Sequence, residues 1–186
     1  MILRVEIKGD EHFPTRPEEI SDLTSEAFRS ITPKEISPGV HSVGSQAWFT
    51  VGEPDSKSPR TYLRVTADER SGYGALSWWS SAQSGGMYDF FWLSDNPGPS
   101  CAGPQLIADP CSGECYEPAS ALPLALIRAA IEEYCASGTG ERPTCIGWVT
   151  GEYDGTRHDG PRFKVWLDAF PREPDPNPEP IRTEIA

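Results

Sequence analysis

Residues 121–148 constrain the fold of this chain more than any other stretch, because they predict a complete helix, a turn and a strand in succession. Ser120 is placed to cap the helix, Pro123 suits the first turn, and Gly138 lies just past the end. One apolar stripe at helical spacing is formed by Leu124, Ile127, Ile131 and Tyr134. The sequence therefore predicts a helix over 123–136 that packs one face against a sheet.

A second helix and several strands are predicted from similar local patterns. Leu3, Val5 and Ile7 alternate with charged residues, which indicates a half-buried strand, and an apolar stripe predicts a helix over 17–31. Apolar runs separated by turn residues indicate an antiparallel meander with strands over 46–51, 61–66, 73–79 and 87–93. Further short strands are predicted over 106–108, 144–149 and 163–167.

The length of the chain, 186 residues, suits one domain with a hydrophobic core. We predict a single α+β domain over 1–170, in which two amphipathic helices pack on a mostly antiparallel sheet. Residues 171–186 alternate proline with charged residues, and this pattern is typical of an extended, flexible tail outside the core.

Charge and hydrophobicity limit the classes of partner and the location. A net charge of −12 disfavours binding to phosphate backbones or anionic membranes, so no nucleic acid or membrane is expected as a partner, and a charged partner is expected to be basic. The sequence contains no run of about 18 apolar residues and no signal-peptide pattern at its start. We therefore expect a soluble, cytoplasmic protein.

The five cysteines do not have the spacing of a metal site or a disulfide framework. Cys111 and Cys115, with Cys101 upstream, lack the paired CxxC pattern, and no histidine lies near them in the sequence. Reduced thiols are expected, and neither a metal nor another cofactor is predicted.

Carboxylates near strand ends are the strongest argument for catalysis. Asp89, Asp95 and Asp109 lie on or just after predicted strands, where paired carboxyl groups can act as acid and base. No nucleophile elbow, phosphate loop or HExxH motif accompanies them, so no catalytic residue is assigned and the protein is not expected to be an enzyme. A small enzyme, with or without zinc, whose site lies near these carboxylates and the 101–115 loop, is the alternative interpretation.

Several aromatic residues are adjacent in the predicted strands, and this limits how they can pack. Side chains next to each other in a strand point to opposite faces, so they cannot all enter one core. The cluster consists of Trp78, Trp79, Phe90, Phe91 and Trp92. Either the sheet is covered on both faces, or an aromatic and acidic patch is left to bind a protein partner.

The helix-to-strand unit resembles the C-terminal signature of a bacterial immunity-protein family, family one, associated with deaminase toxins of polymorphic toxin systems. The similar features are Pro123 at the helix start, Ala129-Ala130, Tyr134, Gly138, Arg142-Pro143-Thr144 and Trp148. Residues 73–77 and the aromatic strand after them are also similar, so the resemblance extends over residues 43–150.

This resemblance implies an inhibitor without enzymatic activity that binds a cognate toxin in the cytoplasm of the producing cell. An acidic protein would block a deaminase by occupying its basic substrate-binding face. The candidate contacts, chosen because interfaces favour aromatic residues and the partner is expected to be basic, are Trp78, Trp79, Asp89, Trp92, Asp95 and Asp109. A third interpretation is a general protein-interaction scaffold that binds through the proline-rich tail.

Overall fold

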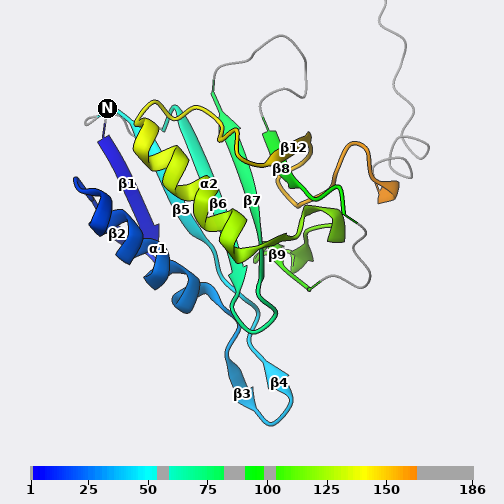
Figure 1. The fold of residues 1–186 in the computed structure, drawn as a ribbon. Coiled ribbons are helices and arrows are strands. Elements are labelled where there is room, and N and C mark those ends of the chain that lie inside the picture. Colours follow the sequence, from blue (N-terminus) through cyan, green and yellow to red (C-terminus); the bar gives the residue numbers. More distant parts are fainter. Residues whose placement is uncertain (1, 54–58, 82–90, 99–103, 163–186) are drawn as a thin grey trace, which may run out of the picture.

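The computed structural model describes residues 2–53, 59–81, 91–98 and 104–162. They form an α+β fold in which two helices lie on one face of a large antiparallel sheet (Figure 1). The strands of this sheet are β1 (Ile2–Ile7), β2 (Asp10–His12), β5 (Ala47–Gly52), β6 (Thr61–Asp68), β7 (Tyr73–Ser80), β8 (Phe91–Asp95), β11 (Leu122–Pro123) and β12 (Gly147–Thr150). Their order is β12-β8-β7-β6-β5-β1-β2, with β11 paired to β7, which confirms the predicted meander from β5 to β8.

Two small hairpins stand outside the main sheet. The first joins β3 (Glu35–Ser37) to β4 (Val40–His41) and projects from one end of the molecule (Figure 1). The second joins β9 (Ile107–Asp109) to β10 (Glu114–Cys115), followed by the short 3-10 helix η1 (Pro118–Ser120). The strand predicted over 106–108 therefore forms, but in a separate pair within the described part of the chain rather than at an edge of the main sheet.

Both predicted helices are present, as α1 (Pro17–Ile31) and α2 (Leu124–Ser137). The expected capping role of Ser120 is wrong, because Pro123 takes the N-cap position of α2 and no side chain caps this end. The Leu124 backbone N–H instead donates to the carbonyl oxygen of Gly72 at 3.0 Å. At the other end, Gly138 has a φ of 61°, the left-handed conformation expected of a glycine that ends a helix.

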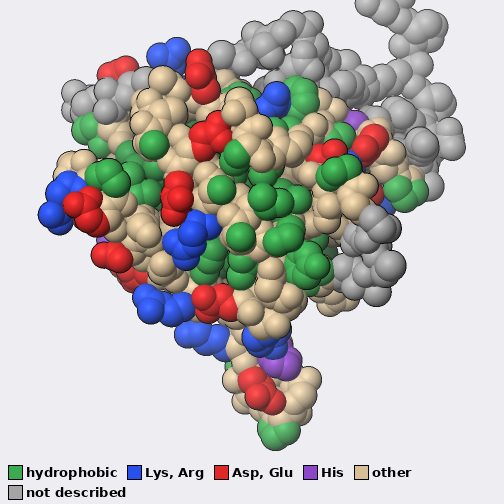
Figure 2. Space-filling model, viewed as in Figure 1, with side chains coloured by type: hydrophobic (Ala, Val, Ile, Leu, Met, Phe, Trp, Pro, Cys, Tyr) green, Lys and Arg blue, Asp and Glu red, His purple; other side chains and the backbone are tan. Residues whose placement is uncertain are grey.

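The larger core lies between the sheet and the two helices. Alternate residues of β5, β6 and β7 face this core, as the period of a strand requires. Its fully buried residues include Phe49, Leu63, Val65 and Leu76 from the sheet and Ile31, Ile127, Ile131 and Tyr134 from the helices. On the outer side, hydrophobic side chains gather over α2 and acidic ones surround them (Figure 2). Leu126 of α2 is 41% exposed there.

The loop between α2 and β12 is held in place by Glu133. The Glu133 carboxylate accepts hydrogen bonds from the backbone N–H and hydroxyl of Thr144 at 2.7 and 2.8 Å, and from the backbone N–H of Cys145 at 3.0 Å. Bonds from the Cys145 side chain and from Thr144 lower the pKa of Glu133 to about 2. The strand predicted from residue 144 begins only at Gly147, because the backbone at 144 and 145 bonds to this carboxylate.

We predict that Glu133→Gln destabilises the protein near neutral pH and that this difference from the wild type shrinks in acid. Glu133 has a lower pKa in the folded than in the unfolded state, so its stabilisation is complete above pH 4.5 and is lost as the pH falls toward about 2. Chemical unfolding from pH 2 to 7 measures this, with the exposed neighbour Glu132→Gln as the matched control. A difference between wild type and Glu133→Gln that stays constant over this range would contradict the assignment.

Candidate protein-binding surface

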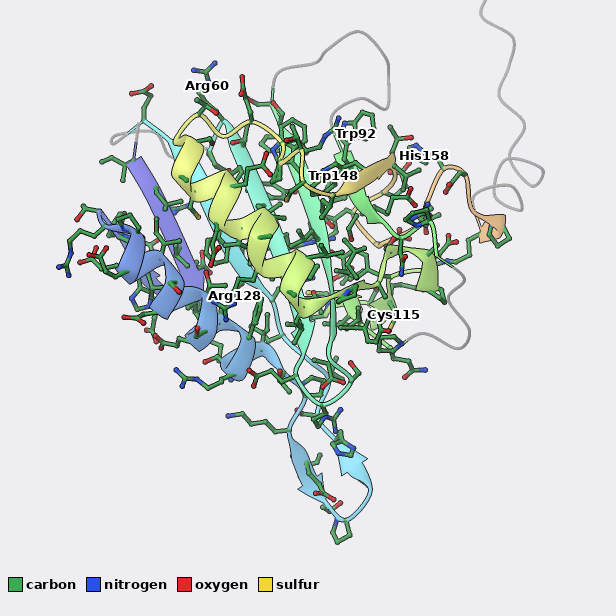
Figure 3. The ribbon with its side chains drawn as sticks, in the orientation of Figure 1. Arg60, Trp92, Cys115, Arg128, Trp148 and His158 are labelled. Carbon is green, nitrogen blue, oxygen red and sulfur yellow. The ribbon has the colours of Figure 1, made fainter. Side chains whose placement is uncertain are left out.

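Two of the predicted contact tryptophans lie on the helix side of the sheet. Trp78 and Trp92 are directly paired across β7 and β8. Together with Trp148 they surround the Arg142 guanidinium, whose carbon lies 5.6, 3.7 and 5.9 Å from the ring centroids of Trp78, Trp92 and Trp148. Figure 3 shows Trp92 and Trp148 beside each other. Trp78 and Trp148 each donate an indole N–H to a backbone carbonyl of the 139–146 loop, so these rings fix the loop to the sheet.

The predicted contact carboxylates are separated in the structure. Asp95 accepts a hydrogen bond of 2.6 Å from Nη2 of Arg157, a buried side chain. Asp109 closes a turn, in which the backbone N–H of Cys111 donates to its carboxylate at 2.9 Å and lowers its pKa. Asp89 lies outside the described residues. The carboxylates of Asp95 and Asp109 thus already accept hydrogen bonds within the protein. They do not form one patch with the tryptophans of the helix side.

The thiols belong to different parts of the fold. Cys111, Cys115, Cys135 and Cys145 are free, whereas Cys101 lies outside the described residues. Burial raises the pKa of Cys135 to about 12 and that of Cys145 to about 11. Over the described ranges, no three His, Cys, Asp or Glu side chains are grouped so as to hold a metal ion.

None of the helices described is long and apolar enough to cross a membrane.

Trp79 points to the opposite face of the sheet, which confirms that neighbouring aromatic residues do not share one core. Its ring stacks on Tyr62, with centroids 5.2 Å apart, and Tyr62 meets Trp48 edge-on at 5.0 Å. This side is turned away from the viewer in Figure 1, behind the sheet. We call it the aromatic face, and its rings are Trp48, Tyr62, Trp79, Phe91 and Tyr153.

Arg64 of β6 lies at the centre of the aromatic face and is completely buried. Its guanidinium carbon is 4.2 Å from the ring centroid of Tyr153. It is also 5.6 to 5.8 Å from the rings of Phe91, Trp48 and Tyr116. Nη2 donates to the Ser77 hydroxyl at 3.1 Å and to the Tyr153 carbonyl oxygen at 2.7 Å, whereas Nε and Nη1 find no hydrogen-bond partner among the residues that the structure describes. Among the described residues, no carboxylate forms an ion pair with Arg64.

Tyr153 is held over Arg64 by a tight turn. The Gly155 N–H donates to the Glu152 carbonyl at 3.1 Å, and the Glu152 N–H donates to the Thr156 carbonyl at 2.8 Å. Gly155 has a φ of +85°, and a Cβ atom there would come within 2.6 Å of the Ala108 side chain. A larger residue at this position would therefore disturb the turn that carries Tyr153. The Tyr153 ring remains 45% exposed.

Comparison with protein families identifies the class of protein. The family model described as Immunity protein Imm1 matches residues 9–150, which is most of the chain, and thus indicates an immunity protein of a toxin system. The chain belongs to the Imm1 family. No curated protein and no solved structure matches it. Family membership implies a cognate toxin as the partner.

Arg64 and Tyr153 were not among the predicted contacts, because neither belongs to a recognisable motif.

We predict that Arg64→Met leaves the free energy of unfolding unchanged or raises it by about 1–4 kcal/mol, because an apolar side chain of similar length replaces a buried cation that forms no ion pair with any described carboxylate. Arg64→Ala is the comparison variant, and it should lower the free energy of unfolding by about 2–5 kcal/mol because it leaves a cavity. Urea titration measures both. Equal destabilisation by the two substitutions would show that the charge of Arg64 itself stabilises the fold.

Proposed function

We propose that this immunity protein inhibits a deaminase toxin by covering the basic surface on which the toxin binds its substrate. Membership of the Imm1 family supports a toxin as the partner. The deaminase class is carried by the resemblance of residues 43–150 to an immunity family associated with such toxins. The observation that favours occlusion of the substrate surface is the net charge of −12.

The chemistry of nucleic-acid deaminases explains why acidity would suit their inhibitor. Such an enzyme needs a cationic surface for the phosphate backbone and a pocket for the base that it removes from the stack. An acidic protein bound at that surface excludes substrate directly. Opposite charges also accelerate association. Both effects favour a fast, competitive inhibitor in the cytoplasm of the cell that makes the toxin.

The described surface carries many carboxylates for such an encounter. Glu18, Asp22 and Glu26 are exposed at four-residue intervals along one side of α1. Glu132 of α2 and Glu141 of the following loop are exposed as well. Figure 2 shows acidic side chains spread over the helix side rather than gathered at one point. The distribution therefore supports long-range attraction to a basic toxin more than one local ion-pair site.

We predict that the protein inhibits deamination by the toxin encoded beside its gene, and that the association rate constant falls about tenfold or more when ionic strength rises from 0.02 to 0.5 M. Dissociation should change much less, because long-range attraction acts before the contact forms. Surface plasmon resonance measures both rates, and deamination of a single-stranded oligonucleotide measures inhibition.

Competition with substrate separates occlusion from a remote mode of inhibition. Excess oligonucleotide should weaken binding of the immunity protein to a catalytically inactive toxin. A chloride series at constant ionic strength controls for specific anion effects. Association that does not depend on salt, or binding that tolerates saturating oligonucleotide, would argue against occlusion of a basic substrate face.

A further inference from the structure

We infer that the aromatic face is the surface that binds the toxin, and that Tyr153 is its anchor residue. This inference rests on the proposed function only in taking the toxin as a basic protein. The rings that form the face come from β5, β6, β7, β8 and the turn after β12. Trp48, Phe91 and Tyr153 lie around Arg64, Tyr62 contacts Trp48, and Trp79 stacks on Tyr62, so the rings contact one another rather than standing as isolated side chains.

The composition of this face matches that of binding hot spots. Tryptophan, tyrosine and arginine contribute most strongly when they meet a partner at the centre of an interface. Tyr153 is the most exposed ring of the face, at 45%, and Trp48, Tyr62 and Trp79 are half-buried around the same centre. In the described part of the chain, the Tyr153 hydroxyl makes no hydrogen bond, so it is available to a partner.

Arg64 gives Tyr153 a fixed position before the partner arrives. Its guanidinium lies 4.2 Å beneath the ring and its Nη2 binds the backbone carbonyl of the same residue. Tyr153 is therefore held by two contacts to one buried side chain, one at its ring and one at its backbone. An anchor that is already ordered loses little entropy on binding, which increases affinity. This role accounts for a buried cation whose Nε and Nη1 have no acceptor in the described part of the chain.

The charges beside Tyr153 favour a cationic partner over the acidic tail of the same chain. Glu152 and Asp154 flank Tyr153, and their side chains remain 50% and 43% exposed although they contact His158 and Arg162. A basic toxin surface complements these carboxylates. Residues 171–186 carry four acidic residues and two arginines, so their net negative charge opposes binding at the same place. The occupant that fits is a basic protein surface with a pocket for a phenol ring.

The decisive experiment compares two exposed tyrosines of the full-length protein. Tyr153→Ala should weaken binding of the inactive toxin at least about 30-fold, the loss typical of a hot-spot residue. Tyr73→Ala is the matched control, because Tyr73 is 38% exposed at the end of β7 remote from Trp79, and it should change affinity less than about threefold. Arg64→Met should also weaken binding, about tenfold, while the protein stays folded by circular dichroism.

Each other result overturns the inference in a recognisable way. If the wild type binds the toxin tightly and Tyr153→Ala binds within about threefold of it, the toxin uses another surface, and toxin inhibition itself stands. If Tyr73→Ala weakens binding as much as Tyr153→Ala, Tyr153 is not an anchor. If a synthetic peptide of residues 171–186 displaces the toxin, the aromatic face belongs to the tail. If the wild type fails to bind the toxin at all, the proposed function fails together with this inference.

Discussion

The central constraint of this structure is a sheet that is apolar on both faces. Along β6, Leu63 and Val65 point toward the helices, while Tyr62 and Arg64 point the other way. Neither face is suited to water, so each must be covered. The helices α1 and α2 cover the first face over β1, β6 and β7, and the loop before β12 covers it at Trp78 and Trp92. Residues 104–121 and the Tyr153 turn cover part of the second face, where Phe91 and Arg64 are buried, and Trp48, Tyr62 and Trp79 of the aromatic face stay half-buried.

The elements that could be predicted from the sequence are those whose signals lie within one segment. The stripe of α1 repeats every three to four residues, and the strands of the meander are separated by turn residues, so both follow from local pattern. The bond that fixes the start of α2 does not follow from local pattern, because the Leu124 N–H donates to the carbonyl of Gly72, which is distant in the sequence. Ser120 has the right chemistry for a cap but is used elsewhere, as an acceptor for Arg157 at 3.4 Å.

The residues of the proposed binding surface could be predicted only where the alternation of side chains along a strand decides which face each residue occupies. Alternation separates Trp78 from Trp79 and therefore places one tryptophan on each face. Arg64 gives no such indication, since an arginine in a strand is ordinarily a solvent-facing residue. Its burial depends on Ser77 and Tyr153, which lie 13 and 89 residues away in the sequence. Sequence pattern alone therefore could not show that these residues form one site.

The two buried arginines show how the fold and the site differ in their energetics. Arg157 bonds to Asp95 and Asp159 at 2.6 and 2.9 Å and to the carbonyl of Ala119, so its charge is compensated and it joins three segments of the fold. Within the described ranges, Arg64 forms no ion pair with a carboxylate, and its Nε and Nη1 have no acceptor. Each such buried donor costs about 1–3 kcal/mol. The four aromatic rings within 5.8 Å of its guanidinium carbon offset part of this cost. In the role proposed for Arg64, the remaining cost is retained because Arg64 orders Tyr153 for a partner.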